Sequence, residues 1–123
     1  MATSAAASRF AATATRMLGG FLIWAAHFAA IYGLTGLACA RGFAETRWLA
    51  IPLVPLAVGL LTVVAVAVTA MLIVRASRDA RLSTVRIDAT ACFIEWMTAS
   101  AGGLAIVAMI WDALPVLMVP VCG

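Results

Sequence analysis

The chain has 123 residues, of which 66% are hydrophobic and 11% are charged, and its mean hydropathy is +1.14. An ordinary globular domain has about 25% charged residues, and a small soluble domain leaves much of its surface in water. The composition therefore excludes a soluble domain, a disordered chain and a disulfide-framework mini-protein, and it indicates an integral membrane protein. The net charge of +3 comes from arginines in short segments between apolar runs, so we expect no nucleic-acid partner.

Three apolar segments predict three transmembrane helices. Residues 17–38 contain His27 as the only acidic or basic side chain, residues 49–74 contain none, and residues 91–114 contain Glu95 and Asp112. About 20 apolar residues cross the hydrocarbon core, and backbone groups in lipid must be hydrogen-bonded within their own segment. We therefore predict an all-α integral membrane protein with one membrane domain over residues 1–123, because each remaining segment is shorter than the roughly 40 residues that a separate domain needs.

Turn-forming residues predict where the helices begin and end. Two prolines fall in the first turn of the second helix, where a missing N–H is harmless. The second loop is expected over residues 75–88, with two hydroxyl residues as candidate helix caps. Two further prolines should end or kink the third helix, and the N-terminal tail is expected to be flexible or to lie on a surface. In chain order, these residues are Pro52, Pro55, Ser83, Thr84, Pro115 and Pro120.

The distribution of arginine predicts the orientation. Six arginines lie in the N-terminal tail and the second loop, two lie in the first loop, and none lies in the C-terminal tail. Cytoplasmic segments carry the excess of positive charge, so we expect a cytoplasmic N-terminus and a periplasmic C-terminus. A cleaved signal peptide is the competing interpretation, but the first apolar run is long for one and contains His27.

His27 is the candidate cofactor-binding residue, because it lies roughly 15 Å into the first span at 1.5 Å per residue. A histidine at this depth could bind haem or copper, relay a proton, or form a structural hydrogen bond between helices. No second histidine or CxxC motif accompanies it, so we favour the structural interpretation and expect no metal site in this chain. Thr98 and Ser100 of the third span are its expected neighbours.

Glu95 and Asp112 lie toward opposite ends of the third span, where they could handle protons or form ion pairs. We favour ion pairing, of Glu95 with Arg86 and of Asp112 with Arg41 or Arg47. Neither carboxylate is forced to the centre of the bilayer.

Small residues at four-residue spacing predict close contact between the first and third helices. The second helix is expected to face lipid or to dock by shape alone. The predicted packing residues are Ala29, Gly33, Gly36, Thr98, Gly102 and Gly103.

The predicted orientation separates the three cysteines. Cys39 and Cys122 would lie on the oxidising side and Cys92 on the reducing side, so we predict a disulfide between Cys39 and Cys122. Their spacing fits no standard metal-binding motif.

The sequence contains no motif that indicates catalysis, so we expect no enzyme. Two segments do resemble a known group of proteins. They are WAAHFAAIYGL at 24–34, followed by CARG at 39–42, and WDALPVLMVPVC at 111–122. Both are similar to segments of short bacterial membrane proteins associated with gene clusters for caa3-type haem–copper cytochrome c oxidases.

The resemblance implies an accessory, non-catalytic subunit of a respiratory oxidase in the bacterial inner membrane. Its partners would be phospholipid and the other membrane subunits, and those subunits would hold the haem and copper. It supplies no established site residues. An assembly factor that handles haem or copper transiently through His27 and a small transporter or holin-like pore are the alternatives.

Overall fold

The computed structural model describes residues 2–85 and 87–122. Its helices are α1 (Ala2–Met17), α2 (Gly19–Arg41), α3 (Leu53–Val85) and α4 (Ala89–Met118). The antiparallel strands β1 (Arg47–Trp48) and β2 (Ile51–Pro52) form a short hairpin between α2 and α3. Helices α2, α3 and α4 are long and apolar enough to cross a membrane. The predicted all-α class with three candidate membrane spans is confirmed.

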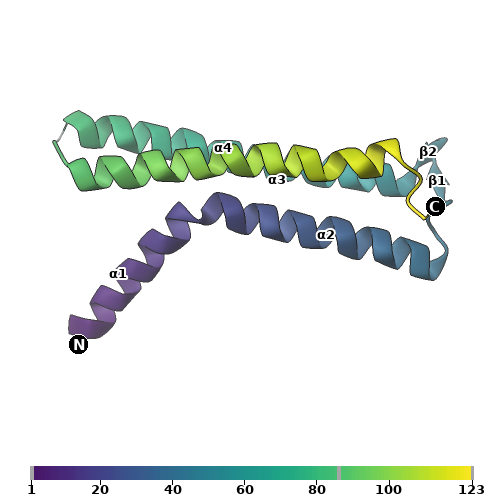
Figure 1. Ribbon diagram of the computed structural model, residues 1–123, viewed down its shortest axis with the longest axis horizontal. Coiled ribbons are helices and arrows are strands. Elements are labelled where there is room, and N and C mark those ends of the chain that lie inside the picture. The colour runs from purple at the N-terminus through teal and green to yellow at the C-terminus, as the bar shows by residue number, and fades with distance from the viewer. Residues whose placement is uncertain (1, 86, 123) are drawn as a thin grey trace.

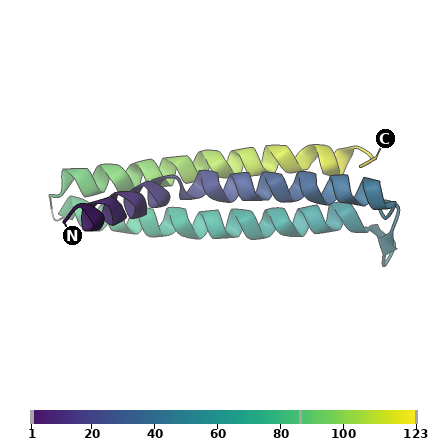
Figure 2. The same cartoon turned by 90° about the horizontal axis from the view of Figure 1, so that it is seen from below.

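Helices α2, α3 and α4 lie side by side, with α3 antiparallel to α2 and α4 antiparallel to α3 (Figures 1 and 2). Helix α1 diverges from this bundle (Figure 1). The α3–α4 junction and the N-terminus lie at one end of the molecule, which we call the junction end (Figure 1). The hairpin and the C-terminal segment lie at the opposite end, which we call the hairpin end (Figure 1). Segments that were expected on the same side of the membrane therefore lie at the same end of the bundle.

The end of α2 and the start of α3 follow from local backbone geometry. Gly42, with φ +72°, ends α2 in the left-handed conformation, and Phe43 N–H donates to Ala38 O at 3.1 Å. The hairpin turn then places Leu49 and Ala50 at φ +51° and +68°, the positive values that a tight hairpin turn requires. Helix α3 consequently begins at Leu53, four residues after the predicted start of the second span.

The prediction of a loop over residues 75–88 was wrong, because α3 continues to Val85. Ala76 and Ala80 are buried on this extension, so packing of α3 supports helix beyond its most apolar part. Thr84 Oγ1 donates to Ala80 O within α3 and caps no new helix. The cap of α4 is Asp88, whose side chain accepts a hydrogen bond from Ala91 N–H at 3.0 Å.

The structure adds detail to two expectations about the chain ends. The N-terminal tail is helical over Ala2–Met17, and a break at Leu18 separates it from α2. Pro115 does not end α4, which continues to Met118, and Val119 N–H donates to Pro115 O at 2.9 Å. A proline this close to a helix terminus removes one hydrogen bond and leaves the last turn in place.

The buried core is built mainly from small side chains. One cluster near the hairpin end contains Ile31, Ala38, Val54, Val58 and Ala113, and a second contains Ala65, Ala105 and Met109. Small residues allow the helix backbones to approach closely, and most large apolar side chains point outward. Helix α3 packs along α4, which agrees with the docking alternative for the second helix and not with a helix that only faces lipid.

The predicted packing residues are divided between the inside and the outside of the bundle. Thr98 and Gly102 are buried, and Gly102 lies directly against Gly20 of α2. Ala29, Gly33 and Gly36 are exposed, and a Cβ at Gly33, Gly36 or Gly103 would meet nothing within 4 Å. The expected contact through Ala29, Gly33 and Gly36 was therefore wrong. Helix α2 is apolar around its whole circumference, so its sequence does not identify the inward face.

Candidate functional site

His27 forms a hydrogen bond between helices inside the bundle. Its side chain is 2% exposed, and Nε2 lies 2.9 Å from Thr62 Oγ1 of α3. Thr62 Oγ1 also lies 2.8 Å from Val58 O, to which it can only donate. The arrangement that satisfies both contacts has His27 Nε2–H donating to Thr62 Oγ1, with the proton of neutral His27 on Nε2. Nδ1 is buried and has no hydrogen-bond partner among the described residues.

The partner of His27 differs from the one expected. Thr98 and Ser100 instead donate to the carbonyls of Ile94 and Trp96 within α4. Thr62 was missed because a threonine in an apolar helix usually bonds its own backbone. Thr62 and Thr69 are the two hydroxyl residues of the second span, and the position of Thr62 at the middle of that span was the available signal.

Asp112 joins α4 to α2 through a tryptophan. Trp24 Nε1–H donates to Asp112 Oδ2 at 2.7 Å, so the expected pairing with Arg41 or Arg47 was wrong. Trp24 also begins a ladder of aromatic side chains along α2. Its ring centroid lies 5.9 Å from that of Phe28, and the Phe28 centroid lies 4.4 Å from that of Tyr32. These contacts fix the indole N–H toward α4 while the ladder continues on the outside of α2.

The two hydrogen bonds link α2 to both other membrane-length helices. A carboxylate or imidazole in an apolar interior requires a partner, and each bond supplies one. Among residues 2–85 and 87–122, no three His, Cys, Asp or Glu side chains gather in a group that could hold a metal ion. The hydrogen bond between His27 and Thr62 supports a structural role for the imidazole.

Glu95 belongs to an ion-pair network at the junction end. Arg16 of α1 contacts Asp79 of α3, and Arg16 Nη1 lies 3.1 Å from Glu95 Oε1. The expected partner, Arg86, lies outside the described residues. The Glu95 side chain is only 8% exposed, so Arg16 neutralises a carboxylate that would be costly to bury alone. This network ties α1 to the bundle, which the sequence did not indicate.

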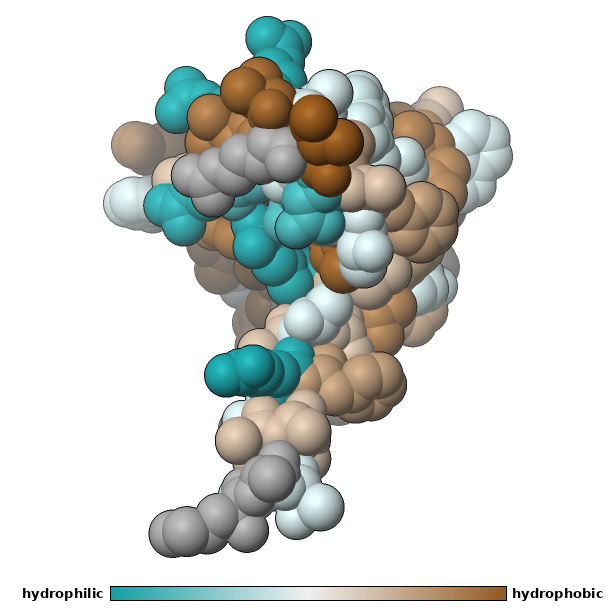
Figure 3. All heavy atoms as spheres, turned by 90° about the vertical axis from the view of Figure 1, so that its left-hand side faces the viewer, coloured by the Kyte–Doolittle hydropathy of each residue, from teal (hydrophilic) through white to brown (hydrophobic). Residues whose placement is uncertain are grey.

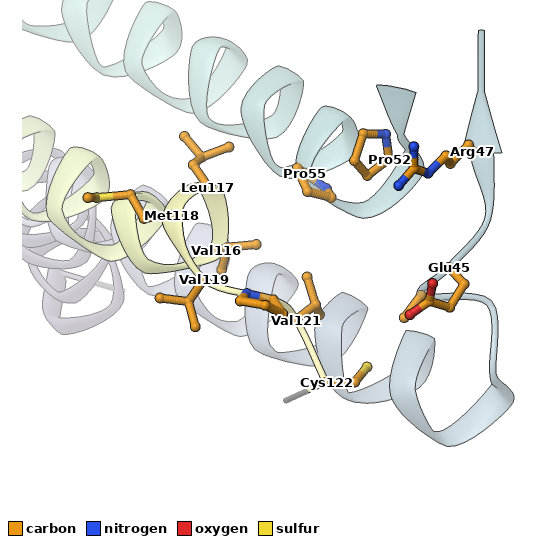
Figure 4. A pocket seen from close by; sticks show the side chains of 12 residues that line it. Glu45, Arg47, Pro52, Pro55, Val116, Leu117, Met118, Val119, Val121 and Cys122 are labelled. Atoms are coloured by element: carbon orange, nitrogen blue, oxygen red, sulfur yellow. The ribbon is translucent and has the colours of Figure 1, made fainter. Parts of the chain in front are cut away.

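The hairpin end contains the predicted disulfide. Cys39 at the end of α2 is bonded to Cys122, with the two Cα atoms 5.7 Å apart, while Cys92 is a free cysteine. A pocket of about 450 Å³ lies beside this bond. Glu45, Arg47, Pro52 of β2 and Pro55 of α3 face the C-terminal segment across it (Figure 4). The disulfide therefore holds the C-terminal segment against the end of α2.

We expect His27→Ala to destabilise the bundle by about 1 kcal/mol, the value of one hydrogen bond between membrane helices. The measurement is denaturant unfolding of the purified chain in detergent. Thr62→Val removes the same bond, and the double variant should cost little more than either single variant. Fully additive losses of stability would show that the two side chains are not coupled.

We also expect no Soret band from the isolated chain, because His27 is predicted to bind no haem. A Soret band that disappears in His27→Ala would contradict the structural role.

Comparison with protein-family models, with curated proteins and with solved structures found no match to this chain.

Proposed function

We propose that this protein is an accessory, non-catalytic subunit of a respiratory haem–copper oxidase in a bacterial inner membrane. Residues 24–34, 39–42 and 111–122 resemble segments of short bacterial membrane proteins associated with gene clusters for caa3-type oxidases, and this resemblance supports the proposal. These segments supply both partners of the Trp24–Asp112 hydrogen bond and of the Cys39–Cys122 disulfide. The resemblance therefore falls on residues that join α2 to the C-terminal part of the chain. Haem and copper would be held by the partner subunits.

The observation that carries the proposal is a row of small residues on the outside of α2. Ala25, Ala29, Gly33 and Gly36 recur at spacings of four, four and three, and all are exposed. A Cβ at Gly33 or Gly36 would meet no atom of the described residues within 4 Å. Small residues at this spacing let another membrane helix approach closely, which drives association in lipid. This row suits α2 to pack against a helix of a partner subunit.

Copurification tests this function. The tagged chain is purified in mild detergent from membranes of its source, and haem spectra and subunit stoichiometry of the product are measured. We expect retention of oxidase subunits in a fixed ratio. Substoichiometric association would favour the assembly factor, for which the unpartnered His27 Nδ1 is the relevant feature. Solute flux through the purified chain alone would favour a pore, and absence of haem proteins from the product would contradict the proposal.

Variants of the small-residue row make the test specific. Gly33→Leu with Gly36→Leu should release the partner subunits without unfolding the chain. Gly59→Leu with Gly103→Leu is the matched control, because a Cβ at either position also meets nothing within 4 Å. These control positions lie on α3 and α4, so partner retention should persist. Equal loss of partner subunits from both double variants would exclude the small-residue row of α2 as the contact surface.

The proposed orientation gives a separate prediction. The N-terminus and the α3–α4 junction would face the cytoplasm, because the arginines at these segments outnumber those near the hairpin by six to two. We expect a C-terminal alkaline phosphatase fusion to be active, since phosphatase folds only outside the cytoplasm. A C-terminal GFP fusion should not fluoresce. An inactive phosphatase together with a fluorescent GFP fusion would reverse the orientation.

A further inference from the structure

A groove at the junction end combines an apolar wall with unpaired arginines. It has a volume of about 730 Å³ and is lined mainly by α3, with Arg16 of α1 and Thr98 of α4 completing it. We call it the junction groove. It lies where α1 leaves the bundle, and hydrophilic side chains gather over this end of the molecule (Figure 3). Its chemistry therefore changes over a short distance from apolar to basic.

The wall of the groove is apolar and open to its surroundings. Val68 and Met71 line it and are 47% and 57% exposed, and Leu72 and Ala76 lie beside them. Val68, Met71 and Leu72 fall inside the segment whose composition predicts a membrane span. Hydrocarbon is the natural occupant of an exposed apolar wall at this depth.

The rim of the groove carries a net positive charge, because Arg16, Arg75 and Arg78 line it together with one carboxylate, that of Asp79. Arg75 and Arg78 line it one and four residues beyond the apolar segment, and neither forms an ion pair with any described residue. Arg16, in contrast, already contacts Asp79 and Glu95. At 1.5 Å per residue, Arg75 lies about 10 Å along α3 from Val68. The two free guanidinium groups thus stand just outside the hydrocarbon layer, where lipid phosphates lie.

We propose that the junction groove binds an anionic glycerophospholipid. Its acyl chain would pack along Val68, Met71 and Leu72, and its phosphate would accept hydrogen bonds from Arg75 and Arg78. Guanidinium groups bind phosphate through paired N–H donors, and basic pockets beside membrane helices favour anionic headgroups. The proposal of a lipid site does not depend on the proposed oxidase partner. The bound lipid would fix the angle between α1 and the bundle by filling the space between them.

The test compares lipid binding by the purified full chain in neutral detergent, measured by native mass spectrometry. Phosphatidylglycerol should bind at least about tenfold more tightly than phosphatidylcholine, and added salt should reduce the difference. Each arginine near an anionic surface contributes about fivefold, so Arg75→Gln with Arg78→Gln should weaken phosphatidylglycerol binding about 30-fold. Phosphatidylcholine binding should not change.

The matched control is Arg41→Gln with Arg47→Gln, which removes the same charge from the hairpin end. It should retain the preference for phosphatidylglycerol. Arg75→Lys with Arg78→Lys should also retain most of it, and this pair decides the matter if the glutamine pair fails to fold. Equal binding of the two lipids, or equal losses in the Arg75/Arg78 and Arg41/Arg47 variants, would overturn the proposal. Competition by glycerol phosphate or inorganic phosphate as strong as by phosphatidylglycerol would show a simple anion site instead.

Discussion

Gly20→Ala is expected to destabilise the helix bundle by about 1–3 kcal/mol, the cost of adding a methyl group to a tightly packed interior. A Cβ at Gly20 would lie 2.8 Å from Gly102 Cα and 3.1 Å from Gly102 N. These are backbone atoms, so relief requires movement of α4 itself. On its other side Gly102 faces Ile73, whose Cγ1 would lie 2.7 Å from a Cβ at Gly102. Helix α4 therefore has little room to retreat toward α3.

Unfolding of the variant in detergent, followed by circular dichroism, measures this effect. Gly33→Ala is the matched control, because it lies on the same helix and a Cβ there meets nothing within 4 Å. Alanine is intrinsically better than glycine in a helix by about 1 kcal/mol, so the control should be neutral or slightly stabilising. Identical unfolding of the two variants would show that α2 and α4 do not approach each other at Gly20.

Removal of the disulfide by Cys39→Ser with Cys122→Ser should cost about 2–4 kcal/mol, the usual contribution of a native disulfide. The bond joins residues separated by 83 positions, and α3 and α4 lie in the loop that it closes. Chain-entropy models give more for so long a loop, but helices held in a membrane are already restricted, which lowers the gain. The C-terminal segment beyond Met118 should lose its contact with α2.

Two measurements check this prediction. Mass spectrometry without reductant should find the intact chain lighter by two hydrogens than the reduced chain, with only Cys92 open to alkylation. Unfolding should then shift in the double variant and remain unchanged in Cys92→Ser, the control at the free cysteine. Alkylation of Cys39 and Cys122 without reductant would show that the disulfide is absent. It would also weaken the assignment of both residues to an oxidising compartment.

The buried polar contacts divide into those that could be anticipated and those that could not. The need of His27 for a partner follows from its depth in an apolar segment, yet the choice of Thr62 depends on how α2 is rotated against α3. Asp112 lay close enough to the end of its span for two arginines to be plausible partners, and it is instead bonded to Trp24. A sequence specifies the requirement for a hydrogen bond, but only the assembled helices determine the donor.

The number of membrane-length helices, where each of them begins to within four residues, and the grouping of Cys39 with Cys122 could be predicted from the sequence, whereas α3 ends eleven residues beyond its predicted end. These depend on the length and polarity of continuous segments, which are local properties of the chain. Only the packed helices show that Gly20 meets Gly102, that Arg16 pairs with Glu95, and that Gly33 faces outward. In a soluble helix, the contrast between polar and apolar faces identifies the buried side. Here both faces are apolar, so the inward face is selected by the fit of side chains and backbones between helices.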